Sequence, residues 1–392
     1  MTTRLEDADS TAVFRILSDL IRMPTLPGHS NIALLEYVAS RLRSCGAQPA
    51  FVMEANADRG SLVVRIGPDQ RGGTVLSAHS DVVAVDGQTW SVPPWELTTK
   101  GSRLYGRGTA DMKGFIACCL EILPRVPAGA LKRPVILAIS HDEEIGCKGA
   151  PLLVAHMKRA VPHPASVIVG EPTSMRVVDA HKGIAIYETQ VHGSAAHSSQ
   201  THIAASATLA AAQLVAYLGD IAREHREQGT PLSAFDPPYT TLNVGQLSGG
   251  HAVNIVAEQC QFVWDVRAVS IDDPQAIVHA LNHYAEQRVL PWMRALAPQS
   301  RIDTSELVRA PPLSVRGDPA AKLLALAITG NESSIAVSFA TEAGLFQQAG
   351  FSVAVCGPGS IDQAHRADEF VEISQVQACS HFLAGVVNEL LK

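Results

Sequence analysis

Short apolar runs rich in β-branched residues alternate with helix-like segments through the first half of this 392-residue chain, and no other feature constrains the fold as much. Residues 10–22 and 31–42 carry apolar side chains at helical spacing. The predicted strands then lie at 61–66, 74–78, 134–140 and 166–170, with a helical segment at 114–123. This pattern is typical of the α/β class, in which helices cover a mainly parallel sheet.

The pattern changes after residue 182. Strands are predicted at 184–191, 241–247 and 261–266, together with long helical segments at about 203–225 and 273–288. The first pattern then returns, with a helix near 320–326, a strand at 352–356 and a terminal helix near 374–391. We therefore predict a discontinuous first domain, residues 1–182 and 307–392, with a smaller α+β domain inserted at 183–306. Two domains suit this length, because a domain commonly holds about 150 residues.

The charge balance gives no sign of a nucleic-acid or membrane partner. The chain has 31 Lys and Arg against 38 Asp and Glu, a net charge of −7, and no basic run. Its first residues are acidic and no apolar segment typical of a signal peptide follows. The uncharged, Ala-rich stretch at 203–219 is too short to span a bilayer. We expect neither export nor a membrane anchor.

The cysteines predict a cytoplasmic location. Their number is odd and no Cys-x-x-Cys occurs, as expected of reduced thiols. We assign chemistry to none of them, and expect most to be small buried apolar side chains. The seven are Cys45, Cys118, Cys119, Cys147, Cys260, Cys356 and Cys379.

Ionisable residues follow the predicted strands directly. His79 and Asp81 come after the strand at 74–78, and their spacing of two points both side chains to one face. The pair suits a metal ligand and a carboxylate that fixes its tautomer. A buried hydrogen-bonded pair without a metal would show the same pattern.

Two further strands also end in acids. His141, Asp142, Glu143 and Glu144 follow the strand at 134–140, and Glu171 follows the next strand. Ligands of open α/β sheets bind beyond the carboxyl ends of the strands, so these acids should converge on one crevice. Taken singly, each group could equally be a set of solvated loop acids.

Asp111 and His365 complete the candidate donors. Asp111 lies in a glycine-bearing loop, where it occupies the position that a third glycine takes in a dinucleotide-binding loop, so a nucleotide site is not predicted. His365 follows the last predicted strand. Imidazoles and carboxylates without thiolates suit catalytic zinc, manganese or cobalt, and the number of donors indicates two ions plus a carboxylate base. No Gly-x-Ser-x-Gly motif indicates a serine nucleophile.

Five motifs, in this order along nearly the whole chain, resemble those of the dinuclear-zinc amidohydrolases that include carboxypeptidase G, aminoacylase and succinyl-diaminopimelate desuccinylase. Ala78 is a departure, since the family usually has glycine before the histidine. The motifs are Ser77-Ala-His-Ser-Asp81, Tyr105 to Gly114, Asp142-Glu-Glu144, Gly170-Glu-Pro-Thr173 and the late His365.

The resemblance implies a set of roles in the first domain, which would be the catalytic domain. Asp81 would orient the first histidine, and Glu143 would be the general base. Asp111 would bridge two divalent ions, zinc or alternatively cobalt. One ion would be held by His79, Asp111 and Glu171, and the other by Asp111, Glu144 and His365.

The same resemblance makes the inserted domain a lid and dimerisation domain. It implies that His197 helps to stabilise the tetrahedral intermediate, in the partner subunit of a homodimer. Asn254 and Arg267 would hold the substrate α-carboxylate, for which a guanidinium is well shaped. For Arg267 the alternative is an ion pair at a strand end.

Two late segments, Thr341 to Ala343 and Gly357 to Phe370, look most like the acetylornithine deacetylases of this family. Glu342 would then read the substrate ammonium, the alternative being a packed structural acid. The implied activity is hydrolysis of a small N-acyl amino acid, first N-acetylornithine to ornithine and acetate in arginine biosynthesis. Deacylation of acetylcitrulline or another acyl amino acid is the alternative. A non-catalytic binding homologue is disfavoured because every ligand and the base are present.

Overall fold

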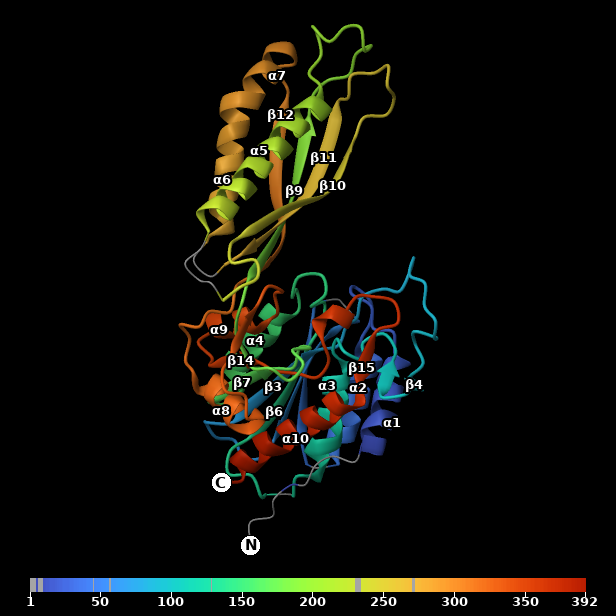
Figure 1. Cartoon of the computed structure of the whole chain (residues 1–392), viewed down its shortest axis with the longest axis vertical. Helices are drawn as coiled ribbons and strands as arrows, with labels where there is room; N and C mark the ends of the chain where they lie inside the picture. The colour runs from blue at the N-terminus through green and yellow to red at the C-terminus, as the bar shows by residue number, and fades with distance from the viewer. Residues whose placement is uncertain are drawn as a thin grey trace. The chain divides into compact units, whose positions relative to one another are not determined.

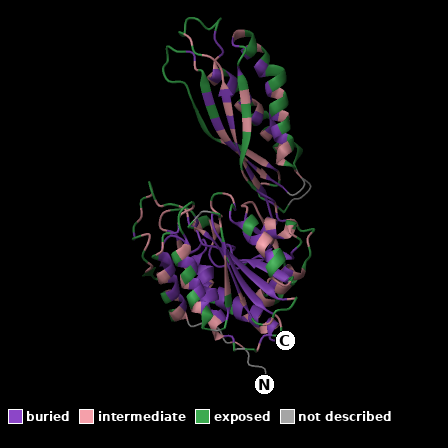
Figure 2. Cartoon of the chain, turned by 180° about the vertical axis from the view of Figure 1, so that it is seen from behind, coloured by how far each residue is buried: buried purple, intermediate pink, exposed green. Residues whose placement is uncertain are grey.

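The computed structural model describes Leu5 and residues 10–44, 46–55, 58–127, 129–229, 234–269 and 272–392. The chain forms two compact units. Unit 1 contains Met1–Ala180, Leu313–Ala336 and Thr341–Lys392, and unit 2 contains His181–Pro312 and Val337–Ala340. Figures 1 and 2 show the elements of each unit and their burial.

Unit 1 is built on a sheet with the strand order β1-β2-β6-β3-β7-β14-β8-β13. Its central pairs, β6 with β3, β3 with β7 and β7 with β14, are parallel, and antiparallel pairs flank them. The predicted α/β class with a mainly parallel sheet is confirmed. The strands are β1 (Gln48–Met53), β2 (Gly60–Ile66), β3 (Thr74–His79), β6 (Val135–Ser140), β7 (Ser166–Val169), β8 (Val178–His181), β13 (Ile335–Val337) and β14 (Val353–Val355).

Every residue of β3, β6, β7 and β14 is buried, as expected of parallel strands covered on both faces. Helix α3 leads from β3 to β6, and α4 leads from β6 back past β3 to β7. Because such crossovers are right-handed, these opposite directions place the two helices on opposite faces. The helices are α1 (Ser10–Ile21), α2 (Ile32–Arg43), α3 (Lys113–Ile122), α4 (Ala150–Ala160), α8 (Ala320–Thr329), α9 (Ala343–Gln348) and α10 (Ile373–Leu390), with the 3-10 turns η1 (Leu123–Arg125) and η3 (Ile361–Gln363).

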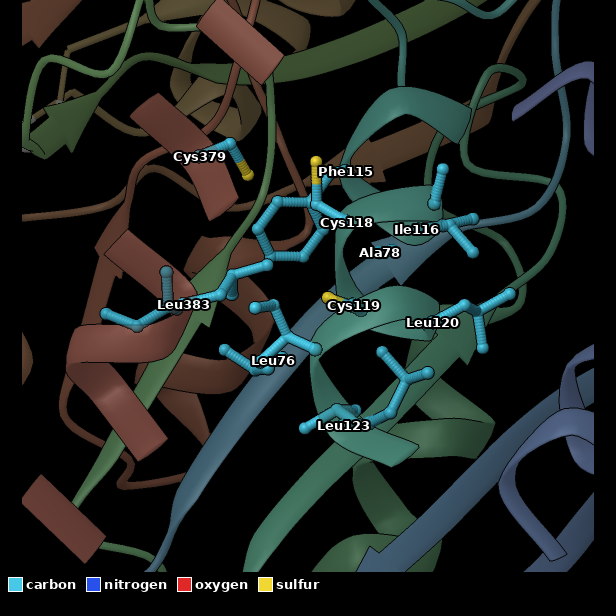
Figure 3. Close-up of a cluster of buried hydrophobic side chains, with 14 of the residues drawn as sticks. Leu76, Ala78, Phe115, Ile116, Cys118, Cys119, Leu120, Leu123, Cys379 and Leu383 are labelled. Carbon is cyan, nitrogen blue, oxygen red and sulfur yellow. The ribbon is translucent and has the colours of Figure 1, made fainter. Parts of the chain in front are cut away.

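Helix α3 lies at the centre of the main core. It packs against α1 and α10, and nine of its ten residues are buried. Figure 3 shows Phe115 of α3 pointing toward Leu76 of β3 and Leu383 of α10, with Leu120 on the other side of the same helix. This packing fixes the loop that precedes α3, which carries Asp111.

A small sheet brings two distant loops together. β15 (Phe370–Glu372) pairs with β5 (Arg103–Tyr105), which pairs with β4 (Thr98–Lys100). The loop with Asp111 follows β5, and the segment with His365 precedes β15. Antiparallel pairing therefore places these two segments at the same end of the small sheet.

Unit 2 has an antiparallel sheet with the order β10-β11-β9-β12. Burial alternates along β9 and β11, because helices cover one face only. Ser206 and Asp273 cap the first turns of α5 and α6 through their side chains. The elements are β9 (Gly183–His192), β10 (Thr241–Gly249), β11 (Gln259–Ala268), β12 (Arg301–Ala310), α5 (Ala207–Gln228), α6 (Pro274–Tyr284), the π-turn η2 (Ala285–Val289) and α7 (Leu290–Leu296).

Strand β12 differs from the sequence analysis, which predicted no strand there and divided the chain at residue 306. The strand runs through that position, and the contacts continue unit 2 to Pro312. β12 is an edge strand whose residues are mostly exposed and polar, so it lacks the apolar alternation of a half-buried strand.

No helix among the described residues is long and apolar enough to cross a membrane. Six cysteines are described, and all six are buried and free. Cys45, which the sequence analysis grouped with them, lies outside the described residues.

Candidate metal centre

His79 ends β3 and is almost completely buried. Its Nδ1 atom lies 2.9 Å from the backbone carbonyl oxygen of Asp81 and donates to it. This contact leaves Nε2 to face Asp111, whose Oδ1 atom is 2.9 Å away, and Glu171, whose Oε1 atom is 3.6 Å away. The ring is thus held in the orientation that a metal ligand needs.

Asp111 presents one carboxylate oxygen to each of two histidines. Oδ1 faces His79, and Oδ2 lies 3.4 Å from Nε2 of His365. His365 also lies 2.8 Å from Oε2 of Glu144. The end of β3, the loop before α3 and the loop that carries His365 therefore meet at the Asp111 carboxylate.

The Asp81 side chain acts on the neighbouring loop. Oδ1 accepts the backbone N–H of Glu143 at 3.1 Å, and Oδ2 accepts that of Glu144 at 3.0 Å. The sequence analysis expected this carboxylate to orient His79. The closest contact with the His79 ring is made instead by the Asp81 carbonyl group, and the carboxylate oxygen is 3.7 Å from Nδ1.

Burial and mutual repulsion raise the pKa values of three carboxyl groups at this site. Burial raises the pKa of Glu143 to about 8, with Glu144 and Asp81 adding to the shift and His79 opposing it. Burial also raises the pKa of Glu144, to about 7, and Asp111 adds to that shift. The pKa of Glu171 lies well above its usual range for the same two reasons.

The pKa values of the two histidines are also raised, because carboxylates surround both rings. Hydrogen bonds with Asp111 and Glu144 raise the pKa of His365 to about 10. Burial lowers the pKa of His79, but Asp111 and Glu171 outweigh burial and hold it well above its usual range. Burial would raise the pKa of Asp111, but the hydrogen bonds from His365 and His79 keep it well below its usual range.

The donor set fits divalent cations. Two groups have ligand atoms within 4.8 Å of one another: His79 with Asp111 and Glu144, and His79 with Glu143 and Glu171. The Oε1 atom of Glu144 is buried and has no hydrogen-bond partner among the described residues. Several buried acids share two imidazoles, so positive charge at this place would relieve their repulsion.

Comparison with known proteins shows the family. The model of the peptidase family M20/M25/M40 matches residues 75–389, which include all the side chains that meet at Asp111. The chain belongs to the peptidase family M20/M25/M40. As an M20 member it is a metallo-hydrolase, and the family predicted from the motifs is confirmed.

Two acetylornithine deacetylases align with nearly the whole length of this M20 chain. An acetylornithine deacetylase of Myxococcus xanthus is 33% identical over 383 residues, which are 95% of this chain and 95% of that protein. An acetylornithine deacetylase of Pasteurella multocida is 30% identical over 386 residues, 96% and 97% of the two chains.

Two solved structures share the fold at low identity. A metallo-carboxypeptidase of the M20 family from Sulfolobus solfataricus has a TM-score of 0.75 at 17% identity, covering 97% of this chain and 99% of that one. A dinuclear metal-binding M20 peptidase from Bacillus subtilis has a TM-score of 0.65 at 13% identity, with the same coverage.

Glu369 is a further residue of this M20 site. The sequence motif from Gly357 to Phe370 contains it, but no role was predicted for it. Its buried carboxylate accepts the backbone N–H groups of Gly108, Ala110 and Asp111 at 2.9, 2.9 and 3.1 Å. It also lies 2.7 Å from the buried guanidinium of Arg107. Glu369 thereby fixes the backbone of the Asp111 loop. No short spacing signals this contact, because its partners lie about 260 positions earlier.

The contact of Cys147 with Glu143 was also not predicted from the sequence. The Sγ atom of Cys147 donates to Oε1 of Glu143 at 3.2 Å. Burial, followed by the charges of Glu143 and Glu342, raises the pKa of this thiol well above its usual range, so it stays protonated.

A third group of possible ligands already has a cationic partner and does not favour a metal. The ligand atoms of Glu54, His141 and Asp142 lie within 4.8 Å of one another. Arg59 contacts both carboxylates, at 3.0 and 3.1 Å, and the backbone N–H of Gly28 donates to Asp142 at 2.7 Å. The guanidinium already supplies the positive charge that a cation would bring.

Glu342 stands at the start of α9 and is only 1% exposed. Its Oε1 atom accepts the hydroxyl of Ser77 at 2.5 Å, while Oε2 is buried with no hydrogen-bond partner among the described residues. Burial raises the pKa of Glu342, and the Ser77 hydrogen bond opposes that shift.

The other three predicted residues belong to unit 2. His197 and Asn254 lie on adjacent loops, since the backbone N–H of Ser198 donates to the Asn254 carbonyl at 2.9 Å. The Nδ1 atom of His197 is 2.8 Å from the Ser199 hydroxyl. Arg267 forms an ion pair of 3.3 Å with Asp265, the alternative contact considered for it from the sequence.

Proposed function

We propose that this chain is a two-metal N-acyl amino acid deacylase whose preferred substrate is N-acetylornithine. The observation that carries the proposal is the single carboxylate of Asp111, which faces His79 with one oxygen and His365 with the other, at 2.9 and 3.4 Å. The acetylornithine deacetylases of Myxococcus xanthus and Pasteurella multocida, similar over at least 95% of the chain, support the choice of substrate.

In this proposal His79, Asp111 and Glu171 would hold one divalent ion, and Asp111, Glu144 and His365 would hold the other. Zinc suits these imidazole and carboxylate donors, with cobalt as a working substitute. When bound, the ions supply a water of lowered pKa and polarise the amide carbonyl.

Glu143 performs the proton transfers. It accepts the proton of the attacking water and delivers it to the leaving nitrogen as the amide bond breaks. A base with a pKa raised toward neutrality suits both halves of this task, because it must take a proton and then give it up. Asp81 holds the backbone of Glu143 and Glu144 during the cycle.

Unit 1 is the catalytic domain in this proposal, and unit 2 is the lid and dimerisation domain. Asn254 and Arg267 bind the substrate α-carboxylate, and His197 of a homodimer stabilises the tetrahedral intermediate. Strand β10 supports dimerisation, because it is an edge of the unit 2 sheet with largely exposed residues. The free buried thiols support a cytoplasmic location.

Glu342 is proposed to bind the substrate ammonium through Oε2, for which the described part of the chain offers no hydrogen-bond partner within bonding geometry. Its burial favours one second candidate, a deacylase with broader preference in which Glu342 is structural. Replacement of Glu342 by Gln distinguishes the two. Loss of the preference for acetylornithine over acetylmethionine supports the ammonium contact. An unchanged preference makes Glu342 structural, and a wild type without this preference supports the broader deacylase.

The first experiment measures hydrolysis by chelator-treated protein after zinc or cobalt is restored. N-acetylornithine is compared with N-acetylcitrulline, N-acetylmethionine and succinyl-diaminopimelate. Metal-dependent release of ornithine well above the other products is the expected result. If the metal-dependent protein prefers another of these substrates, the proposed substrate is wrong and the proposed mechanism still stands. If it hydrolyses no acyl amino acid, the proposal is contradicted.

A further inference from the structure

Cys147 occupies a backbone position that ordinarily favours glycine. Its φ is 55°, and the preceding Gly146 has a φ of 99°. For a residue with a Cβ atom this left-handed conformation is disfavoured, and such positions cluster at functional sites. A glycine here would remove the conformational cost, so the Cys147 side chain should supply a compensating interaction.

That interaction is with the proposed base. The Cys147 thiol donates to Oε1 of Glu143 at 3.2 Å, and the residue is only 3% exposed. The backbone of the same turn contacts the other end of Glu143: its carbonyl oxygen accepts the N–H groups of Gly146 and Cys147 at 2.9 and 2.8 Å. The turn therefore holds Glu143 by both its main chain and its side chain.

We propose that Cys147 is a positioning residue for Glu143, whose thiol holds Oε1 and so leaves Oε2 to exchange the proton with water and leaving group. This inference rests on the proposed role of Glu143 as the base. A carboxylate side chain with a free rotor would spend time away from the water, and small misplacements of a reacting group lower rates steeply.

The other described cysteines do not share this environment. The Cys118 thiol, for example, lies in α3 at 3.6 Å from the backbone carbonyl of Val376. Cys118 and Cys147 are thus buried thiols of the same unit, one contacting a main-chain carbonyl and one contacting the proposed base. They form a matched pair for substitution.

The test compares Cys147→Ala, Cys147→Ser and the control Cys118→Ala. Alanine and serine keep the Cβ atom at φ 55°, so the three residues bear a similar backbone cost, and only serine keeps a donor. For Cys147→Ala we expect about a tenfold fall in kcat, the effect of one lost hydrogen bond, with KM and bound metal unchanged. Cys147→Ser should recover most of kcat, and Cys118→Ala should keep it.

Three results would overturn the proposal. They are an unchanged kcat in Cys147→Ala, a serine variant as slow as the alanine variant, and loss of bound metal from Cys147→Ala in elemental analysis. If the wild-type protein hydrolyses no acyl amino acid, the proposed function fails separately. Crystal structures of the three Cys147 forms then still decide the positioning role, since a Glu143 carboxylate that stays in place without the thiol would contradict it.

Discussion

At the scale of single residues, the adjacent side chains of Glu143 and Glu144 make different contacts and have different proposed roles. The backbone N–H groups of Glu143 and Glu144 each donate to a different oxygen of the Asp81 carboxylate. Their carboxylates then diverge, one to the Cys147 thiol and one to His365. The side-chain contacts thus differ between the proposed base and the proposed ligand.

Replacement of Glu143 by Ala tests this separation. We expect the variant to keep its bound metal and to lose roughly 10³-fold or more in kcat, because a positioned base contributes on the order of 10²–10⁴. Elemental analysis and substrate turnover are measured on the same sample. Loss of metal with activity would instead make Glu143 a ligand, as its proximity to His79 and Glu171 would also permit.

The pKa shifts of the acids predict a pH-dependent stability of the metal-free protein. The pKa values of Glu143 and Glu144 are raised to about 8 and about 7. A raised folded-state pKa stabilises the fold below the unfolded value, and this contribution is lost as pH rises through the folded value. His365, at about 10, acts in the same direction at higher pH, whereas Asp111, whose pKa is lowered, destabilises only at acid pH.

The Tm of chelated protein should therefore fall between about pH 5 and pH 8, while bound metal offsets the loss. Differential scanning calorimetry of zinc-loaded and chelated samples gives the difference in Tm at each pH. That difference should widen as pH rises. A constant difference across the range would show that these carboxyl groups do not titrate as the geometry implies.

At the scale of elements, β15 and the Asp111 loop depend on one carboxylate. Glu369→Gln would set an amide group against backbone donors and leave the Arg107 charge buried without its partner. We expect the free energy of unfolding to fall by about 3 kcal/mol and metal affinity to fall with it, because a broken buried pair is costly. Chemical denaturation and metal titration measure the two effects.

The control lies on the same small sheet. Glu372→Gln removes a carboxylate that pairs with Arg103 at 2.6 Å in an exposed position. Exposed pairs contribute little, so this variant should unfold like the wild type. Equal destabilisation by the two substitutions would show that β15 is sensitive to any lost charge, and not to the contact with the Asp111 loop.

Comparison of sequence and structure at this scale shows what local patterns can supply. The strand ends that carry His79, Glu143, Glu144 and Glu171 were predicted, because apolar periodicity marks where a buried strand stops. The contacts of Glu369 and Cys147 were not predicted. Glu369 contacts residues about 260 positions earlier in the chain, and the Cys147 contact requires a turn with a left-handed backbone conformation. Strand β12 was missed because an exposed polar edge shows no apolar alternation.

At the scale of the whole molecule, unit 2 presents exposed apolar side chains that a single copy of the chain leaves in water. Leu209 of α5 is 63% exposed and Leu247 of β10 is 56% exposed. Together with Val253, Leu209 also lines a hollow of about 620 Å³. Leu209 and Val253 are exposed apolar residues that line one hollow, and such a patch favours an interface, which agrees with the proposed homodimer.

Replacement of Leu209 by Glu together with Leu247 by Lys should convert a dimer to a monomer, because unpaired charges would be buried on association. Light scattering after size-exclusion chromatography measures the mass. The control replaces Leu323 of α8 in unit 1, also exposed at 58%, by Glu and should remain dimeric. A wild-type chain that is monomeric at micromolar concentration would contradict the proposed homodimer.

The discontinuous sheet of unit 1 also sets an order of events on the ribosome. Strand β7 pairs with β3 on one side, but its other neighbour, β14, is translated only after all of unit 2. Until then β7 is an open edge of the nascent chain, and His365 has not yet emerged. The inserted unit can fold while the sheet of unit 1 waits for β14, so the proposed metal site at Asp111 is completed only late in synthesis.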